Sequence, residues 1–237
     1  MIRAVLSALT ALSLTLAASP LRAEGPVVVE LFTSQGCSSC PPADELLGQL
    51  AARDDVIALG LHVDYWDYIG WTDTFADPQF TARQQGYGRA AGSRVVYTPQ
   101  MIVGGIDHVV GNRPMEVADT IMAHRGRIYP VSIDVTQAEG GYRIEARADT
   151  AQPRSDMVVQ LVRYMPHQQV NIARGENAGR YVDYHNIVLS WQVIGEWDGR
   201  RPFVGRVQPQ DEMPLVVIVQ AADSGPILGV TRLTQGH

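Results

Sequence analysis

The sequence predicts an α/β first half of order β-α-β-α-β-β-α, over residues 24–126, followed by an all-β, sandwich-like second half over residues 127–237. Three observations favour this division. A run of β-branched and apolar residues, Val27–Phe32, leads into two cysteines. Helical and strand patterns alternate as far as Arg125. From Ile128 onward the chain changes to short alternating runs, separated by loops rich in Gly, Asn and Asp.

The first 23 residues have the pattern of a secretory signal peptide. Arg3 provides the basic start, Ala4–Ala18 the apolar run and Leu21-Arg22-Ala23 the small-residue end. We therefore expect a mature chain from Glu24 that is periplasmic or secreted, with no membrane insertion after signal removal. A net charge of −6 with no run of like charges argues against nucleic acid as a partner.

The elements of the first half follow from periodicity and from the positions of Pro and Gly. Val27–Phe32 and Val56–Val63 are expected to be buried parallel strands joined by a helix that begins at Pro41. A second helix is expected over Pro78–Ala91. The remaining elements are a hairpin turned at Gly104-Gly105, and a helix from Pro114 through Arg125 with Val117, Ile121 and Met122 as its apolar stripe.

Cys37 and Cys40, the only cysteines, form a C-x-x-C pair at the end of the first strand. Such a pair exchanges between dithiol and disulfide, so one thiolate can attack a partner's disulfide and the other can resolve it. We expect Cys37 to be the exposed nucleophile and Cys40 the resolving thiol. Two alternatives stay open: a purely structural disulfide, and a two-thiolate copper(I) site. The six histidines lack paired ligand spacing, so we predict no other metal site and no cofactor.

Two other features lie close to the cysteines in the predicted sheet. Glu30 interrupts the first strand, so its carboxylate is either locally exposed or buried near the sulfurs, where it could accept a proton from the resolving thiol. The aromatic and acidic loop Asp64–Trp71 follows the second parallel strand and therefore reaches the same sheet edge. Its Tyr65 and Trp66 either face a substrate or cap the core.

With C-x-x-C after the first strand of this element order, residues 26–125 resemble the thioredoxin superfamily. Thr98-Pro99, before an apolar strand, is similar to the superfamily's cis-proline segment, which implies that these two residues position an extended substrate. Glu30 is similar in place to the buried acid of thioredoxins, one residue further from the first cysteine. The proline pair Pro41-Pro42 departs from the usual pattern.

Three stretches resemble a narrower family of secreted bacterial thioredoxin-like proteins catalogued only as a domain of unknown function. They are Leu31–Asp44, His62–Asp67 and Arg174–Arg180. From its residues alone, Gly175–Gly179 is expected to be a turn with positive-φ positions.

The resulting hypothesis is an exported thiol-disulfide oxidoreductase that acts on protein or small-molecule thiols. The alternative from another class is a non-catalytic binding module of thioredoxin fold, or a copper(I) chaperone.

Overall fold

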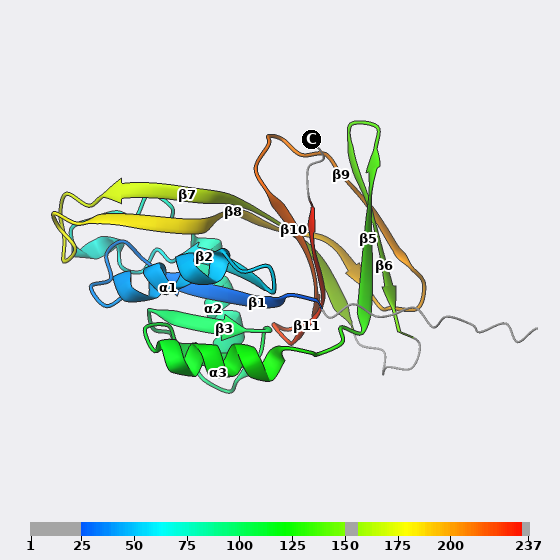
Figure 1. Ribbon diagram of the computed structural model, residues 1–237, viewed down its shortest axis with the longest axis horizontal. Coiled ribbons are helices and arrows are strands. Elements are labelled where there is room, and N and C mark those ends of the chain that lie inside the picture. Colours follow the sequence, from blue (N-terminus) through cyan, green and yellow to red (C-terminus); the bar gives the residue numbers. More distant parts are fainter. Residues whose placement is uncertain (1–24, 150–155, 234–237) are drawn as a thin grey trace, which may run out of the picture.

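The computed structural model describes residues 25–149 and 156–233, which form a mixed α/β structure with two sheets (Figure 1). The expected signal peptide, residues 1–23, lies outside the described residues. The larger sheet has eight strands in the order β11-β10-β7-β8-β2-β1-β3-β4, and the smaller has three in the order β5-β6-β9. None of the described helices is long and apolar enough to cross a membrane.

The first half has the predicted element order, with one added turn of 3-10 helix, η1. Its elements are β1 (Val27–Thr33), α1 (Pro41–Ala51), β2 (Val56–His62), η1 (Asp67–Ile69), α2 (Pro78–Ala90), β3 (Gln100–Val103), β4 (Asp107–Val110) and α3 (Pro114–His124). Each α-helix begins at a proline, whose fixed φ suits the first helical turn. Strands β1 and β2 are parallel, as expected, and every residue of both is buried.

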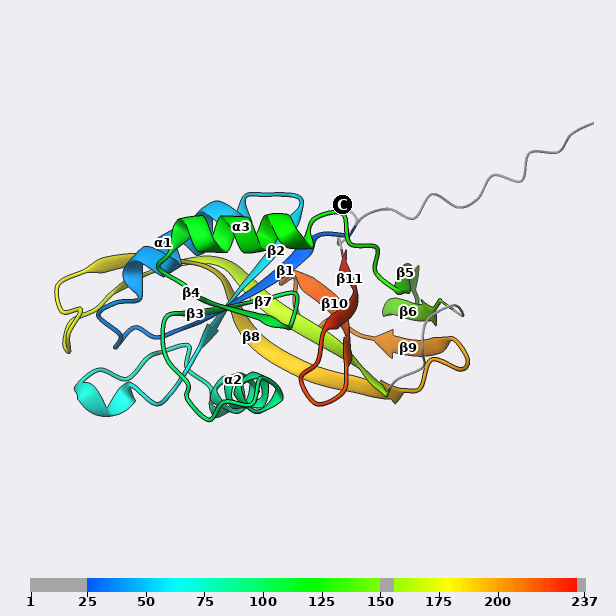
Figure 2. The same cartoon turned by 90° about the horizontal axis from the view of Figure 1, so that it is seen from below.

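Helices cover both faces of this part of the sheet (Figure 2). Alternate β1 residues Val27, Val29 and Leu31 pack with α1 and α3, whereas Val28 and Phe32 pack with α2 on the opposite face. The hairpin turn at Gly104-Gly105 is confirmed, with both glycines at positive φ. In α3, Val117 and Ile121 are buried as predicted, but Met122 is exposed.

The second half is all-β, but it is not a separate sandwich. Its strands are β5 (Val131–Ala138), β6 (Gly141–Ala148), β7 (Met157–Asn171), β8 (Tyr181–Trp197), β9 (Phe203–Val207), β10 (Leu215–Ala221) and β11 (Ile227–Leu233). Strands β7, β8, β10 and β11 extend the sheet of the first half, through a bridge between Gly60 of β2 and Ile187 of β8. The three-stranded sheet packs against this extension across an apolar core, which is the sandwich-like part of the prediction.

The long β7–β8 hairpin reaches across the end of the first half that carries the start of α1 (Figure 1). Ile172, Val182 and Tyr184 of this arm form an apolar cluster with Trp71 and Phe75 of the loop after β2. The second half therefore contributes directly to the edge at which the cysteines lie.

Candidate functional site

Cys37 and Cys40 form a disulfide at the start of α1, with their Cα atoms 5.4 Å apart. Cys40 caps α1, and its carbonyl accepts the backbone N–H groups of Ala43 and Asp44. Ser38 and Ser39, between the two cysteines, are exposed. In contrast, Cys37 is only 1% exposed and Cys40 is 0% exposed. The expectation that Cys37 would be an exposed nucleophile is therefore wrong for this oxidised state.

A side chain from the second half of the chain bonds to the main chain of the cysteine loop. The side-chain amide of Asn177, in the tip of the β7–β8 hairpin, donates hydrogen bonds of 2.9 Å to the carbonyls of both Gln35 and Cys37. Gly175 and Gly179 have the predicted positive φ, at +78° and +80°. The turn was thus predictable, but its contact with the cysteine loop was not, because Gln35 and Asn177 lie 142 residues apart.

Thr98, Trp66 and the cysteine loop come together on one side of the disulfide. The Thr98-Pro99 bond is cis, a state that the sequence left open. The Trp66 indole N–H donates to Thr98 Oγ1 at 2.7 Å, and Ser39 Oγ lies 3.5 Å from both Thr98 O and Cys37 Sγ. Pro99 lies near the start of α1, since a Cβ built on Gly111 would be 3.1 Å from Pro99 Cβ and 3.2 Å from Ala43 Cβ.

Tyr65 has a different environment from its neighbour Trp66. Its hydroxyl donates to Gln84 of α2 at 3.2 Å, and burial raises the pKa of Tyr65 to about 12. Gln84 in turn donates to the carbonyl of Tyr97, one residue before Thr98. Tyr65 therefore supports the segment that leads to Thr98, which is closer to the core-capping alternative, whereas Trp66 lies against the cysteine loop at Gly36.

Glu30 is buried, but its recorded partners are not the cysteines. Arg83 of α2 donates to both carboxylate oxygens, at 2.6 and 2.9 Å, and the Tyr87 hydroxyl donates at 2.6 Å. Glu30 points to the α2 face because it alternates with Val29 and Leu31, which face α1. The Glu30 carboxylate therefore does not lie in the expected place near the sulfurs, because it bonds to α2 on the face of the sheet opposite α1.

Asp44 is the buried acid on the cysteine side of the sheet. It lies one helical turn after Cys40 and is 3% exposed. Burial raises the pKa of Asp44 to about 7, against the opposing charge of His62. No local pattern in the sequence indicated that the Asp44 side chain would turn inward.

His62 and Asp73 form a buried pair beside Asp44. His62 Nδ1 lies 2.7 Å from Asp73 Oδ2, which also accepts the backbone N–H of Gln35 at 2.7 Å. Burial lowers the pKa of His62, but the charge and hydrogen bond of Asp73 outweigh it and leave that pKa above the ordinary value. The pKa of Asp73 is lowered, because His62 and two backbone N–H donors outweigh the effect of burial. This pair fixes the cysteine loop at Gln35.

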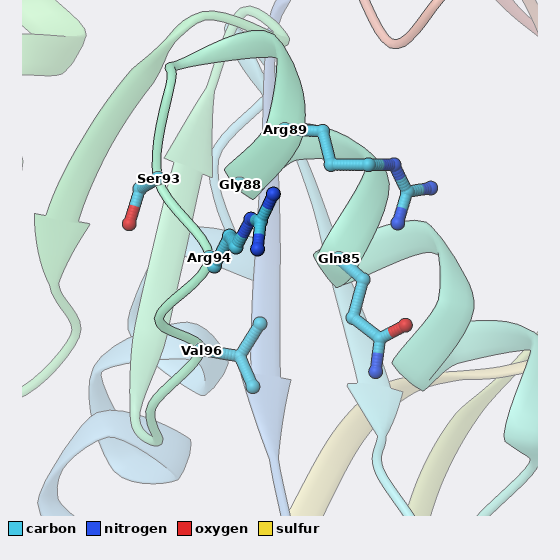
Figure 3. A pocket seen from close by; sticks show the side chains of 6 residues that line it. All are labelled: Gln85, Gly88, Arg89, Ser93, Arg94 and Val96. Carbon is cyan, nitrogen blue, oxygen red and sulfur yellow. The ribbon is translucent and has the colours of Figure 1, made fainter.

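Two hollows flank this region. One, of about 710 Å³, lies between α1 and the β7–β8 arm and is lined by Pro41, Glu45, Arg180, Asp183 and His185 among others. The other, of about 400 Å³, lies between the end of α2 and the loop that leads to Thr98 (Figure 3). Arg89 and Arg94 are among the residues that line the second hollow, so two of its lining side chains are basic.

Within residues 25–149 and 156–233, no group of three or more His, Cys, Asp or Glu side chains could hold a metal ion.

Comparison with solved structures supports the whole arrangement of the chain. A crystal structure of a protein from Agrobacterium tumefaciens is 34% identical, with a TM-score of 0.76, covering 91% of this chain and 99% of the other. HBP35 of Porphyromonas gingivalis is similar in fold, with a TM-score of 0.64 at 14% identity, covering 89% of this chain and 75% of the other. None of the curated proteins compared with the chain matches it. Residues 28–220 match the model of the family described as "Protein of unknown function (DUF1223)", and the chain belongs to that family.

Proposed function

We propose that this protein is an exported thiol-disulfide oxidoreductase whose reacting group is the Cys37–Cys40 disulfide. The observation that carries the proposal is the combination of that disulfide, at the start of a helix, with a buried acid one turn later in the same helix. A thioredoxin-like arrangement of residues 26–125 is part of the proposal, supported by the order of elements and by Thr98-Pro99 beside the cysteine loop. The proposed place of action is the periplasm or the medium, where disulfides persist.

The reaction can be written from the oxidised state, with a dithiol as the partner. A partner thiolate attacks Cys37 Sγ, the disulfide breaks, and its electron pair leaves on Cys40 Sγ, which takes a proton. The partner's second thiolate then attacks the partner sulfur of the mixed disulfide. A partner disulfide forms and Cys37 leaves as a thiolate. Two electrons pass from the partner to the cysteine pair, and the reverse direction uses the same steps.

We assign Asp44 as the group that donates the proton taken up by Cys40 Sγ. A carboxyl group with a pKa near 7 is close to evenly divided between its two forms at neutral pH, so it can donate or accept a proton in either direction of exchange. Its main chain is fixed to Cys40, because the Asp44 N–H donates to the Cys40 carbonyl at 3.1 Å. Trp66 and Thr98 form the rim at which a partner would meet Cys37.

Disulfide exchange with a reduced protein tests this proposal. The purified oxidised protein is mixed with a reduced model protein that contains two thiols, and formation of the model protein's disulfide is followed by mass. We expect exchange faster than that of a free peptide of residues 33–44. When the Cys40→Ser variant is mixed instead with the disulfide form of the same model protein, we expect its Cys37 thiolate to attack that disulfide and remain in a trapped mixed disulfide. Exchange no faster than the peptide's contradicts an enzymatic role.

The burial of Cys37 specifically favours a second candidate, a binding module in which the disulfide is structural. In that case reduction of the Cys37–Cys40 disulfide would change the stability of the protein, and no partner protein would exchange thiols with the two cysteines. The Cys37→Ser, Cys40→Ser double variant separates the two candidates, since a binding module retains its partner and an oxidoreductase loses turnover.

A further inference from the structure

The segment of residues 173–180 bonds to the cysteine loop through one buried side chain, that of Asn177. Of residues 173–181 only Asn177 is buried, while its neighbours on both sides are exposed. The base of the arm is held differently, by Ile172, Val182 and Tyr184 in the apolar cluster with Trp71 and Phe75. The tip of the hairpin thus depends on one buried side chain, whereas the arm that carries it depends on a packed cluster.

The bonds that Asn177 makes resemble those that a bound peptide would make. Its amide nitrogen donates to the Gln35 and Cys37 carbonyls at 2.9 Å each, as a backbone N–H of an incoming chain could. Its Oδ1 is buried, and the described residues offer it no hydrogen-bond partner. The anchor is therefore only half satisfied, which lowers the cost of releasing it.

Attack on Cys37 needs this segment to move. An incoming sulfur must come into contact with Cys37 Sγ, in line with the bond that breaks, and a cysteine residue that is 1% exposed offers no such approach. Tip opening needs few contacts to be broken, because the side chains around Asn177 already face solvent.

We propose that residues 173–180 are a cover that Asn177 fastens over Cys37, and that an extended, cysteine-bearing segment of a partner protein displaces it and bonds to the same two carbonyls. This inference rests on the proposed function and adds to it the class of partner and the step that admits it. A folded or bulky thiol without an extended segment would be excluded while the cover is closed.

The rate at which dithiothreitol reduces the disulfide tests the cover. Asn177→Ala removes both bonds to the cysteine loop, so we expect reduction to be about tenfold faster than in the wild type. Asn171→Ala is the matched control, because Asn171 lies in the same hairpin but is exposed and bonds only to Tyr181. Equal rates in Asn177→Ala and the wild type overturn the proposal.

Hydrogen exchange of the wild type gives a second test that does not depend on the variant's folding. The N–H groups of Ile172 and Gly179 bond across the base of the tip, to Arg180 and Ile172 carbonyls. We expect the Gly179 amide to exchange at least about a hundredfold faster than amides of β10, because the tip opens without global unfolding. Equally slow exchange in both places also overturns the proposal. The tip could open fast in a protein that exchanges no thiols with the model protein. That result would support the proposed cover and contradict the proposed oxidoreductase function.

Discussion

Arg83 holds both carboxylate oxygens of Glu30, and this ion pair joins α2 to the centre of the eight-stranded sheet. The guanidinium also lies 3.6 Å over the Trp191 ring and donates to Gln160 and Gln220, so residues from both halves of the chain surround it. The pair is a junction between the halves, on the face of the sheet opposite α1.

Glu30→Gln is expected to destabilise the protein by about 3–5 kcal/mol, because it leaves the Arg83 charge buried without its partner. Denaturant unfolding measures this loss. Arg53→Gln is the control, since its ion pair with Asp55 is exposed and should contribute less than about 1 kcal/mol. In the folded fraction of Glu30→Gln, disulfide exchange should proceed at the wild-type rate. A slower rate would show that Glu30 has a role in the exchange reaction.

Asp44→Asn is expected to change how stability depends on pH. As pH rises from 3.8 toward about 7, Asp44 ionises in the unfolded chain but stays protonated in the folded protein. The wild type therefore loses stability over this range, by up to about 4 kcal/mol at about 1.4 kcal/mol per pKa unit. Asp44→Asn lacks that loss, so the difference in unfolding free energy should grow with pH and level off above about 7. Parallel pH profiles would contradict the raised pKa.

His62→Gln should destabilise the protein most at acidic pH. A histidine whose pKa is raised by folding contributes stability that is full below its ordinary value of 6.5 and is lost as pH rises through the raised pKa. Asp73 has the opposite sign, since its lowered pKa contributes stability above 3.8 that disappears at lower pH. Unfolding midpoints of His62→Gln between about pH 4 and 9, and of Asp73→Asn between about pH 2 and 5, check the two signs. A His62→Gln deficit that widens with rising pH contradicts the assignment.

Trp66→Phe and Thr98→Val remove the donor and the acceptor of one hydrogen bond while retaining most of the shape. A double-mutant cycle on unfolding free energy should give a coupling of about 1 kcal/mol. The same cycle on exchange rate should show that the two single variants slow exchange by similar factors. Tyr129→Phe is the control, since its hydroxyl donates to the Pro26 carbonyl and not to Trp66 or Thr98. Additive effects of the two substitutions would show that the bond has no role at the rim.

Local patterns predicted the first half well because its signals are local. Pro41, Pro78 and Pro114 mark helix starts, and Gly104-Gly105 marks the hairpin, so each element is determined by residues within or beside it. The joining of the halves was not predicted, because the bridge between Gly60 and Ile187 depends on pairing across 127 residues and no local signal records it.

The sequence predicted the two cysteines of the candidate site and the residues of its rim. It did not predict the residues that surround them. Cys37, Cys40, Trp66 and Thr98 meet as expected. Asp44 was missed because an acid in a first helical turn normally faces solvent, and Asn177 because a Gly-rich turn carries no sign of what it touches. Glu30 was misplaced because alternation along β1 sends it to the α2 face.

Strand β2 lies between β1 and β8 in the large sheet. The edge of β2 that faces away from β1 is therefore paired by β8, at the bridge to Ile187. A fragment that ends after residue 126 would present a bare apolar strand edge to other copies of itself, and we expect it to aggregate. Engineers who shorten this protein, or graft its cysteine segment onto another scaffold, would therefore have to transplant the distant strand as well.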